Sequence, residues 1–115
     1  MRIFIILIIS YLIGSIPTAY IIIKKIKKVD IREIGSGNVG ATNATGAGGI
    51  WLGILTFAID FIKGMIPVFF VKNYFDTPML FFILPLTIIS VVCGHIYSIF
   101  LKFKGGKGVA TAAGA

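Results

Sequence analysis

Charged side chains are scarce in this sequence. Lysine, arginine, aspartate and glutamate make up 13% of its 115 residues, whereas hydrophobic residues make up 57%. A soluble domain normally carries about twice that share of charge, and the mean hydropathy here is +1.02. The composition therefore excludes an ordinary soluble domain. We expect an all-α integral membrane protein that forms a single transmembrane domain over residues 1–115.

Cysteine and histidine are nearly absent, since Cys93 and His95 are the only ones. One thiol cannot form a disulfide within the chain, and no cluster of metal-ligating residues is visible, so neither a cofactor nor redox chemistry is implied. Acidic residues are also few, and the formal net charge is +7. This balance favours anionic partners, either lipid headgroups or phosphorylated metabolites. Nucleic acid is not expected, because its binding normally requires a soluble basic face.

Three apolar stretches are long enough to span a bilayer, and they cover Ile3–Ile23, Ala47–Val71 and Met79–Leu101. At about 1.5 Å per residue, each crosses the roughly 30 Å hydrocarbon core as a helix. We expect Pro17 and Gly14 to kink the first stretch, and Pro85, Gly94 and His95 to interrupt the third. Residues 109–115 look like the start of a fourth span.

Basic residues flank these stretches mainly on one side, since only Arg2 and Lys72 lie at the opposite ends. One cluster lies between Lys24 and Arg32, and the other lies between Lys102 and Lys107. The positive-inside rule places both clusters in the cytoplasm and the amino terminus outside. A cleavable signal peptide is the alternative for the first stretch, but that stretch is too long and no small-residue cleavage site precedes the lysines.

The first basic cluster leads into a glycine-rich segment, SGNVGATN, over Ser36–Asn43. Its glycines allow backbone amides to approach a ligand closely, and its polar side chains supply neutral donors to an oxyanion. The glycines at 35, 37 and 40 also match G-x-G-x-x-G, but no strand precedes them, so a dinucleotide site is not indicated. The alternative is a flexible turn that joins two spans.

The second glycine-rich segment, KFKGGKG, covers Lys102–Gly108. Three lysines flank its three glycines, so ammonium groups and backbone amides could converge on one phosphate. The segment is not a Walker A loop, because the glycine and hydroxyl positions of that motif are not met. The alternative is that the lysines only anchor the chain to headgroups.

Ionisable residues inside the spans are costly and need a reason. Asp60 and Lys63 are three residues apart on one helical face, so we expect a structural ion pair. A transport path is a weaker interpretation of the same pair, since no internal repeat is visible. His95 lies about two helical turns before Lys102, where an imidazole could orient or deprotonate a hydroxyl beside bound phosphate. Its alternative is an interfacial histidine bonded to a backbone carbonyl.

Four motifs together resemble the bacterial integral-membrane acyl-phosphate:glycerol-3-phosphate acyltransferases. They are GSIP at 14–17, DIREIGSGNVGATN at 30–43, DFIKG at 60–64 and GHIYSIFLKFKGGKGVAT at 94–111. The resemblance covers essentially the whole chain. It implies transfer of a fatty acyl group from acyl phosphate to the sn-1 hydroxyl of glycerol 3-phosphate, in the bacterial plasma membrane. Both substrates carry phosphate, which agrees with two anion-binding segments.

The resemblance also implies a set of site residues. Ser36 and His95 are the candidate catalytic residues, with His95 assigned to hydroxyl positioning or proton transfer. The candidate substrate-binding residues are Asn38, Thr42, Asn43, Lys104, Gly105, Gly106, Lys107 and Gly108. An acyl phosphate is already activated, so positioning and charge stabilisation suffice and no covalent nucleophile is required.

Two departures from the family's pattern stand out. The family has an arginine three residues after the asparagine of the first segment, where this chain has Gly46. Members of the family also continue through further spans, so we expect this chain to be the amino-terminal portion of a longer acyltransferase domain or to need a complementary chain. The alternative function is a noncatalytic membrane protein that binds phosphate or anionic lipid.

Overall fold

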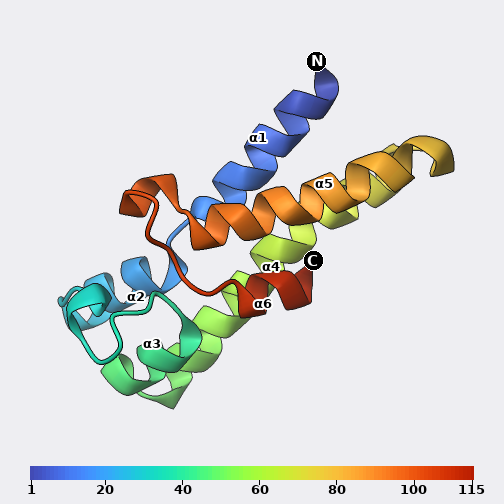
Figure 1. The fold of residues 1–115 in the computed structure, drawn as a ribbon. Helices are drawn as coiled ribbons and strands as arrows, with labels where there is room; N and C mark the ends of the chain where they lie inside the picture. Colours follow the sequence, from blue (N-terminus) through green and yellow to red (C-terminus); the bar gives the residue numbers. More distant parts are fainter.

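The computed structural model describes residues 1–115, and every regular element in it is a helix (Figure 1). The elements are α1 Arg2–Ser15, α2 Thr18–Lys27, η1 Ile31–Glu33, α3 Ala41–Gly48, α4 Ile50–Tyr74, α5 Thr77–Ile96, η2 Ile99–Leu101 and α6 Val109–Gly114. Three segments are long and apolar enough to cross a membrane, namely Arg2–Lys27, Ile50–Tyr74 and Thr77–Leu101. The molecule is 46 Å long, which exceeds the hydrocarbon thickness of a bilayer. The prediction of an all-α membrane fold with three spans and the start of a further helix is confirmed.

The first span is broken rather than kinked. Helix α1 ends at Ser15, Ile16 is extended at φ −57° and ψ 116°, and α2 begins at Thr18. Pro17 has no N–H to continue the hydrogen-bond ladder, and its ring disfavours helical geometry at the residue before it. Gly14, which was expected to share in a kink, stays inside α1. The interruption is therefore local to Ile16 and Pro17.

The third span contains no comparable break. Helix α5 runs without interruption through Pro85, Gly94 and His95, so the interruption predicted there is wrong. Pro67 likewise lies inside α4. Neighbouring helices support a proline inside a membrane helix, which a single helix in water would not. The end of this span also differs from the prediction, which extended the helix to Leu101. Helix α5 ends at Ile96, and residues 99–101 form the separate 3₁₀ turn η2.

Glycines bring α1 and α5 into close contact. The two helices run side by side in the same direction (Figure 1). A Cβ added at Gly14 would overlap the carbonyl oxygen of Val91, and one added at Gly94 would overlap that of Tyr11. Small residues at such crossings allow the backbones to approach, which is how membrane helices gain packing energy without a hydrophobic driving force.

The contact continues beyond the ends of the two helices. Ser98 Oγ donates a hydrogen bond to the Ser15 carbonyl, and Tyr11 OH donates to the Tyr97 carbonyl. Both bonds join the end of α1 to the turn that follows α5. They hold the start of the second glycine-rich segment beside the break in the first span.

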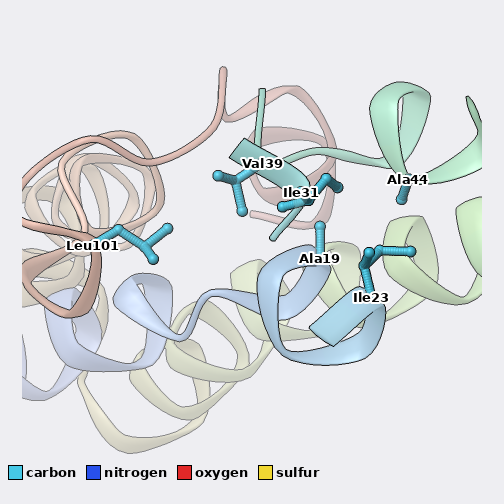
Figure 2. Close-up of a cluster of buried hydrophobic side chains, with 6 residues drawn as sticks. All are labelled: Ala19, Ile23, Ile31, Val39, Ala44 and Leu101. Atoms are coloured by element: carbon cyan, nitrogen blue, oxygen red, sulfur yellow. The ribbon is translucent and has the colours of Figure 1, made fainter. Parts of the chain in front are cut away.

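A small apolar core holds the loop end of the molecule together (Figure 2). It contains Ala19, Ile23, Ile31, Val39, Ala44 and Leu101. These side chains come from α2, η1, the loop after it, α3 and η2. The cluster therefore joins the first glycine-rich segment to the second, although about 60 residues separate them in sequence.

The glycine contact between α1 and α5 generates the first prediction. Gly94→Ala places a methyl group against backbone that cannot move aside, and we expect it to lower the free energy of unfolding by about 1–3 kcal/mol. Gly46→Ala is the matched control, because a Cβ there meets nothing within 4 Å. The control should be neutral or stabilise α3 by up to about 1 kcal/mol. Thermal unfolding in detergent measures both variants, and equal effects would contradict the packing argument.

Candidate functional site

The first glycine-rich segment is part loop and part helix. Residues 34–40 form a loop, and α3 then begins at Ala41, so Thr42 and Asn43 lie in its first turn. The side chain of Asn43 fixes the loop. Its Nδ2 donates to the carbonyls of Ile34 at 2.9 Å, Asn38 at 3.0 Å and Ile31 at 3.2 Å. Gly35 has φ +55°, and a Cβ there would overlap Asn43 Oδ1. The loop thus wraps around one buried amide.

An ion pair supports the entry to this loop. Asp30 accepts from the Arg32 backbone N–H at 2.9 Å and pairs with Arg32 Nη2 at 2.7 Å. The hydrogen bond from the Arg32 side chain lowers the pKa of Asp30 below its ordinary value. The Arg32 guanidinium also lies 4.9 Å from the centroid of the Tyr20 ring in α2. These contacts fasten η1 to α2.

The second glycine-rich segment folds back on the end of α5. The Gly105 N–H donates to the Ile96 carbonyl at 2.8 Å, and the Gly106 N–H donates to the His95 carbonyl at 3.1 Å. A Cβ on Gly105 would overlap the His95 carbonyl oxygen, and one on Gly106 would overlap His95 Nε2. These two glycines are needed because the backbone passes directly against α5. Their role in the structure is to place the segment, not to line a cavity.

The two segments meet around one polar cavity of about 470 Å³. Its lining residues are Ser36, Asn38, Gly40, Ala41, Thr42, Asn43, Phe57, Asp60, His95, Lys107, Gly108, Val109 and Ala110. They come from the loop before α3, from α3, α4 and α5, and from the start of α6. Segments far apart in the sequence thus share one site.

Most of the predicted site residues line this cavity. Those that do are Ser36, Asn38, Thr42, Asn43, His95, Lys107 and Gly108. The lining does not include Lys104, Gly105 or Gly106. Lys104 is exposed to the outside of the segment, and the two glycines lie behind His95. The second segment therefore contributes its last lysine and glycine to the cavity.

The predicted ion pair is present. Lys63 Nζ lies 2.9 Å from Asp60 Oδ1, and both side chains are at most 5% exposed. Asp60 has a second neighbour that the sequence did not indicate, because its Oδ1 lies 3.8 Å from His95 Nδ1. It also lines the cavity. Sequence reasoning treated Asp60 as structural, although a carboxylate inside an apolar span is itself a signal of a site.

The cavity is suited to an oxyanion. Helix α3 begins at its wall, and no side chain caps the amides of its first turn. Uncapped amides at a helix start carry partial positive charge. Lys107 adds a full positive charge, and Ser36 and Asn38 add neutral polar groups.

Other hollows in the molecule lack this chemistry. One of about 440 Å³ lies along α4 between Met65 and Tyr74, and one of about 290 Å³ lies between α1 and α4. Neither is lined by a charged side chain. Both lie on apolar helix surfaces of the kind that contact lipid. The polar cavity is accordingly the candidate active site.

Comparison with known proteins agrees with this geometry. The family model for glycerol-3-phosphate acyltransferase matches residues 4–115. The chain belongs to this family. A glycerol-3-phosphate acyltransferase of Thermotoga petrophila is 48% identical over 107 residues, which cover 93% of this chain and 53% of that protein. One of Aquifex aeolicus is 47% identical, over 99% of this chain and 58% of that protein.

Solved structures of the family share the fold. The glycerol 3-phosphate form of PlsY (YgiH), an integral membrane glycerol 3-phosphate acyltransferase, matches with a TM-score of 0.89 and 46% identity. A lysophosphatidic acid form matches with a TM-score of 0.86 and 43% identity. Each match covers 99% of this chain but 56% and 55%, respectively, of the solved chain. The present chain thus spans about half the length of the relatives it matches.

The role of Asn43 in the loop can be tested by its removal. Asn43→Ala removes a buried donor from three carbonyls, and the Asn38 carbonyl then lacks a donor, whereas those of Ile31 and Ile34 keep a backbone N–H. We expect a loss of about 1–3 kcal/mol in the free energy of unfolding. We also expect faster proteolysis within residues 34–40. Asn73→Ala is the control, because Asn73 makes a single exposed bond to the Phe69 carbonyl. Thermal unfolding and limited proteolysis measure the effect, and similar behaviour of the two variants would contradict it.

Proposed function

We propose that this protein transfers a fatty acyl group from acyl phosphate to the sn-1 hydroxyl of glycerol 3-phosphate, giving lysophosphatidic acid and phosphate. The observation that carries the proposal is the single cavity formed by both glycine-rich segments together with His95. Membership of the glycerol-3-phosphate acyltransferase family supports it. The two similar structures, which are a glycerol 3-phosphate form and a lysophosphatidic acid form of PlsY, support it too.

Phosphate binding follows from the donors around the cavity. Lys107 supplies a charge, and the start of α3 supplies uncapped backbone amides. Ser36 and Asn38 lie on the loop that Asn43 holds, so their side chains are presented from a fixed backbone. Preorganised donors of this kind stabilise the charge that develops in a transition state.

The reaction needs no covalent intermediate. The hydroxyl oxygen attacks the acyl carbonyl carbon, the bond from that carbon to the phosphate oxygen breaks, and inorganic phosphate leaves with the bonding electron pair. The hydroxyl proton passes to a base, and His95 is the candidate because its ring lines the cavity. Holding both substrates in one site supplies much of the rate.

We further propose a placement in the bacterial plasma membrane, with the amino terminus outside and both glycine-rich segments in the cytoplasm. The lysines of α2 and of the second segment support this orientation, because basic residues concentrate on the cytoplasmic side. The same side supplies soluble glycerol 3-phosphate. Membrane lipid is then a neighbour of all three spans.

Lys107 and Lys104 form a matched pair for the test. Both are exposed lysines of the second segment, but only Lys107 lines the cavity. Purified chain in lipid is mixed with acyl phosphate and labelled glycerol 3-phosphate, and lysophosphatidic acid is measured together with binding of the label. We expect Lys107→Ala to weaken binding about tenfold or more, because a charge-assisted hydrogen bond is lost. Lys104→Ala should change it less than about twofold.

Two outcomes would count against the proposal. Equal losses in both variants would show that the lysines act only as a diffuse positive surface. A folded chain that neither binds glycerol 3-phosphate nor forms product would remove the acyltransferase function from this chain. Binding without product would assign the anion site to this chain and the chemistry to the longer assembly.

Gly46 offers a second test, because the resemblance places an arginine there. Gly46 lies one helical turn after Thr42 on α3, and a side chain added to it meets nothing within 4 Å. We expect Gly46→Arg to tighten glycerol 3-phosphate binding by about tenfold, since one more cation reaches the phosphate. Gly46→Ala controls for the change in helix propensity and should leave binding unchanged. Isothermal titration compares the two, and equal affinities would show that the phosphate does not bind near α3.

A further inference from the structure

The turn that follows α5 presents apolar and basic side chains on the outside of the molecule. Ile99, Phe100 and Phe103 are 48%, 61% and 59% exposed, and Lys102 and Lys104 beside them are exposed as well. We call these five residues the η2 surface. Neither lysine pairs with a carboxylate of the chain, and none of the five residues lines the polar cavity. The proposed acyl transfer therefore gives this surface no role.

The η2 surface is held in place from its inner side. Ser98 and Leu101 are 2% and 3% exposed. Ser98 Oγ donates to the Ser15 carbonyl at the end of α1, and Leu101 belongs to the apolar core of Figure 2. The Ser98 carbonyl also accepts from the N–H groups of Leu101 at 3.1 Å and Phe103 at 2.7 Å. The outward side chains are thus presented from a fixed backbone.

The backbone of the turn is strained at two successive residues. Lys102 has φ +54° and ψ +42°, and Phe103 has φ +66°. This left-handed region costs free energy for any residue with a Cβ, and a bulky side chain rarely adopts it. Strain of this kind is found where a segment contacts a ligand and the surrounding structure enforces the conformation. It favours a use for the side chains of Lys102 and Phe103.

The position of the turn indicates what it contacts. It ends the third span, Thr77–Leu101, so it lies where the hydrocarbon core of a bilayer gives way to the headgroups. Figure 1 shows the turn beyond the end of α5. Apolar rings at this depth enter the acyl-chain region, whereas lysine side chains reach back to the headgroup level. Two ammonium groups without a carboxylate partner are complementary to the phosphates of anionic lipids.

We propose that the η2 surface is a docking site for anionic phospholipid. Phe100 and Phe103 enter the acyl-chain region of the leaflet, and Lys102 and Lys104 bind headgroup phosphate. The second glycine-rich segment then has two separate uses, because its first two lysines face lipid and Lys107 lines the cavity. The proposal concerns the outside of the segment and does not depend on acyl transfer.

A diffuse attraction would behave differently from a site. The net charge of +7 would enrich anionic lipid around the whole molecule. Removal of any two positive charges would then lower the enrichment equally. A site at the turn requires instead that the enrichment is local and that it depends on Lys102 and Lys104.

The chain has one tryptophan, Trp51, so a single fluorescent reporter can be moved to the turn. Trp51→Phe/Phe100→Trp is placed in vesicles of phosphatidylglycerol and phosphatidylcholine, with one lipid or the other brominated. Quenching by each lipid gives their relative binding constant at position 100. We expect phosphatidylglycerol to be preferred about threefold or more, because lysines at the surface attract anionic headgroups. Adding Lys102→Asn and Lys104→Gln should reduce the ratio to about one, and asparagine tolerates the left-handed backbone at 102.

Two matched controls accompany this measurement. Arg2→Gln/Lys72→Gln removes the same amount of charge from the opposite ends of the spans, and it should leave the preference at position 100 unchanged. Trp51→Phe/Phe81→Trp places the reporter near the start of α5, where Phe81 is 77% exposed. We expect no preference there, because the η2 surface lies at the other end of the helix.

Three results would overturn the proposal. Equal affinity of the two lipids at position 100 is the first, and it needs no lysine variant to fold. An equal loss of preference in both charge variants would show a diffuse attraction only. Absence of quenching by either lipid would show that water or protein, and not lipid, contacts the turn. No substrate is used, so these results are distinct from an absence of acyltransferase activity.

Discussion

The hydrogen bond from Lys63 to the Ile16 carbonyl is the contact on which the membrane part of this structure depends. Pro17 breaks the first span, and the Ile16 carbonyl at the break accepts from the Thr18 N–H at 3.0 Å. Lys63 adds a second donor to that carbonyl at 2.8 Å. The charge of Lys63 is tolerable in this buried place because Asp60 lies 2.9 Å away. The break in α1, the face of α4 and the wall of the cavity are therefore parts of one arrangement.

Glycine has a second function here besides flexibility, because it sets distances between backbones. Gly14 and Gly94 bring α1 against α5, and Gly105 and Gly106 bring the second segment against the end of α5. A methyl group at any of these positions would push the backbones apart. Since Lys107 follows directly after Gly106, its position at the cavity depends on that close approach. The candidate site thus depends on backbone contacts that extend well beyond the residues lining it.

Hydropathy and helical spacing predicted much of this fold. Three predominantly apolar stretches of more than 20 residues are long enough to cross a bilayer, so the spans were predictable from hydropathy. The three-residue spacing of Asp60 and Lys63 was enough to predict their ion pair. The sequence was less informative about features that tertiary contacts determine, namely which prolines break a helix and which residues line the cavity. Pro17 breaks its helix whereas Pro67 and Pro85 lie inside continuous helices, although none of the three has an N–H to donate. The exclusion of Lys104 from the cavity likewise depends on where Gly105 and Gly106 turn the chain.

The ion pair between Asp60 and Lys63 explains how a carboxylate can line a cavity that is otherwise suited to an anion. Asp60 lines the cavity, and an unpaired carboxylate roughly 4–8 Å from a bound phosphate would repel it by about 2–4 kcal/mol at an effective dielectric constant near 20. Lys63, three residues further along α4, cancels most of that charge. In the proposed function, the net charge near a bound phosphate is then set by Lys107 and by the start of α3. Asp60 can in this way lie 3.8 Å from His95 without opposing the binding that we propose.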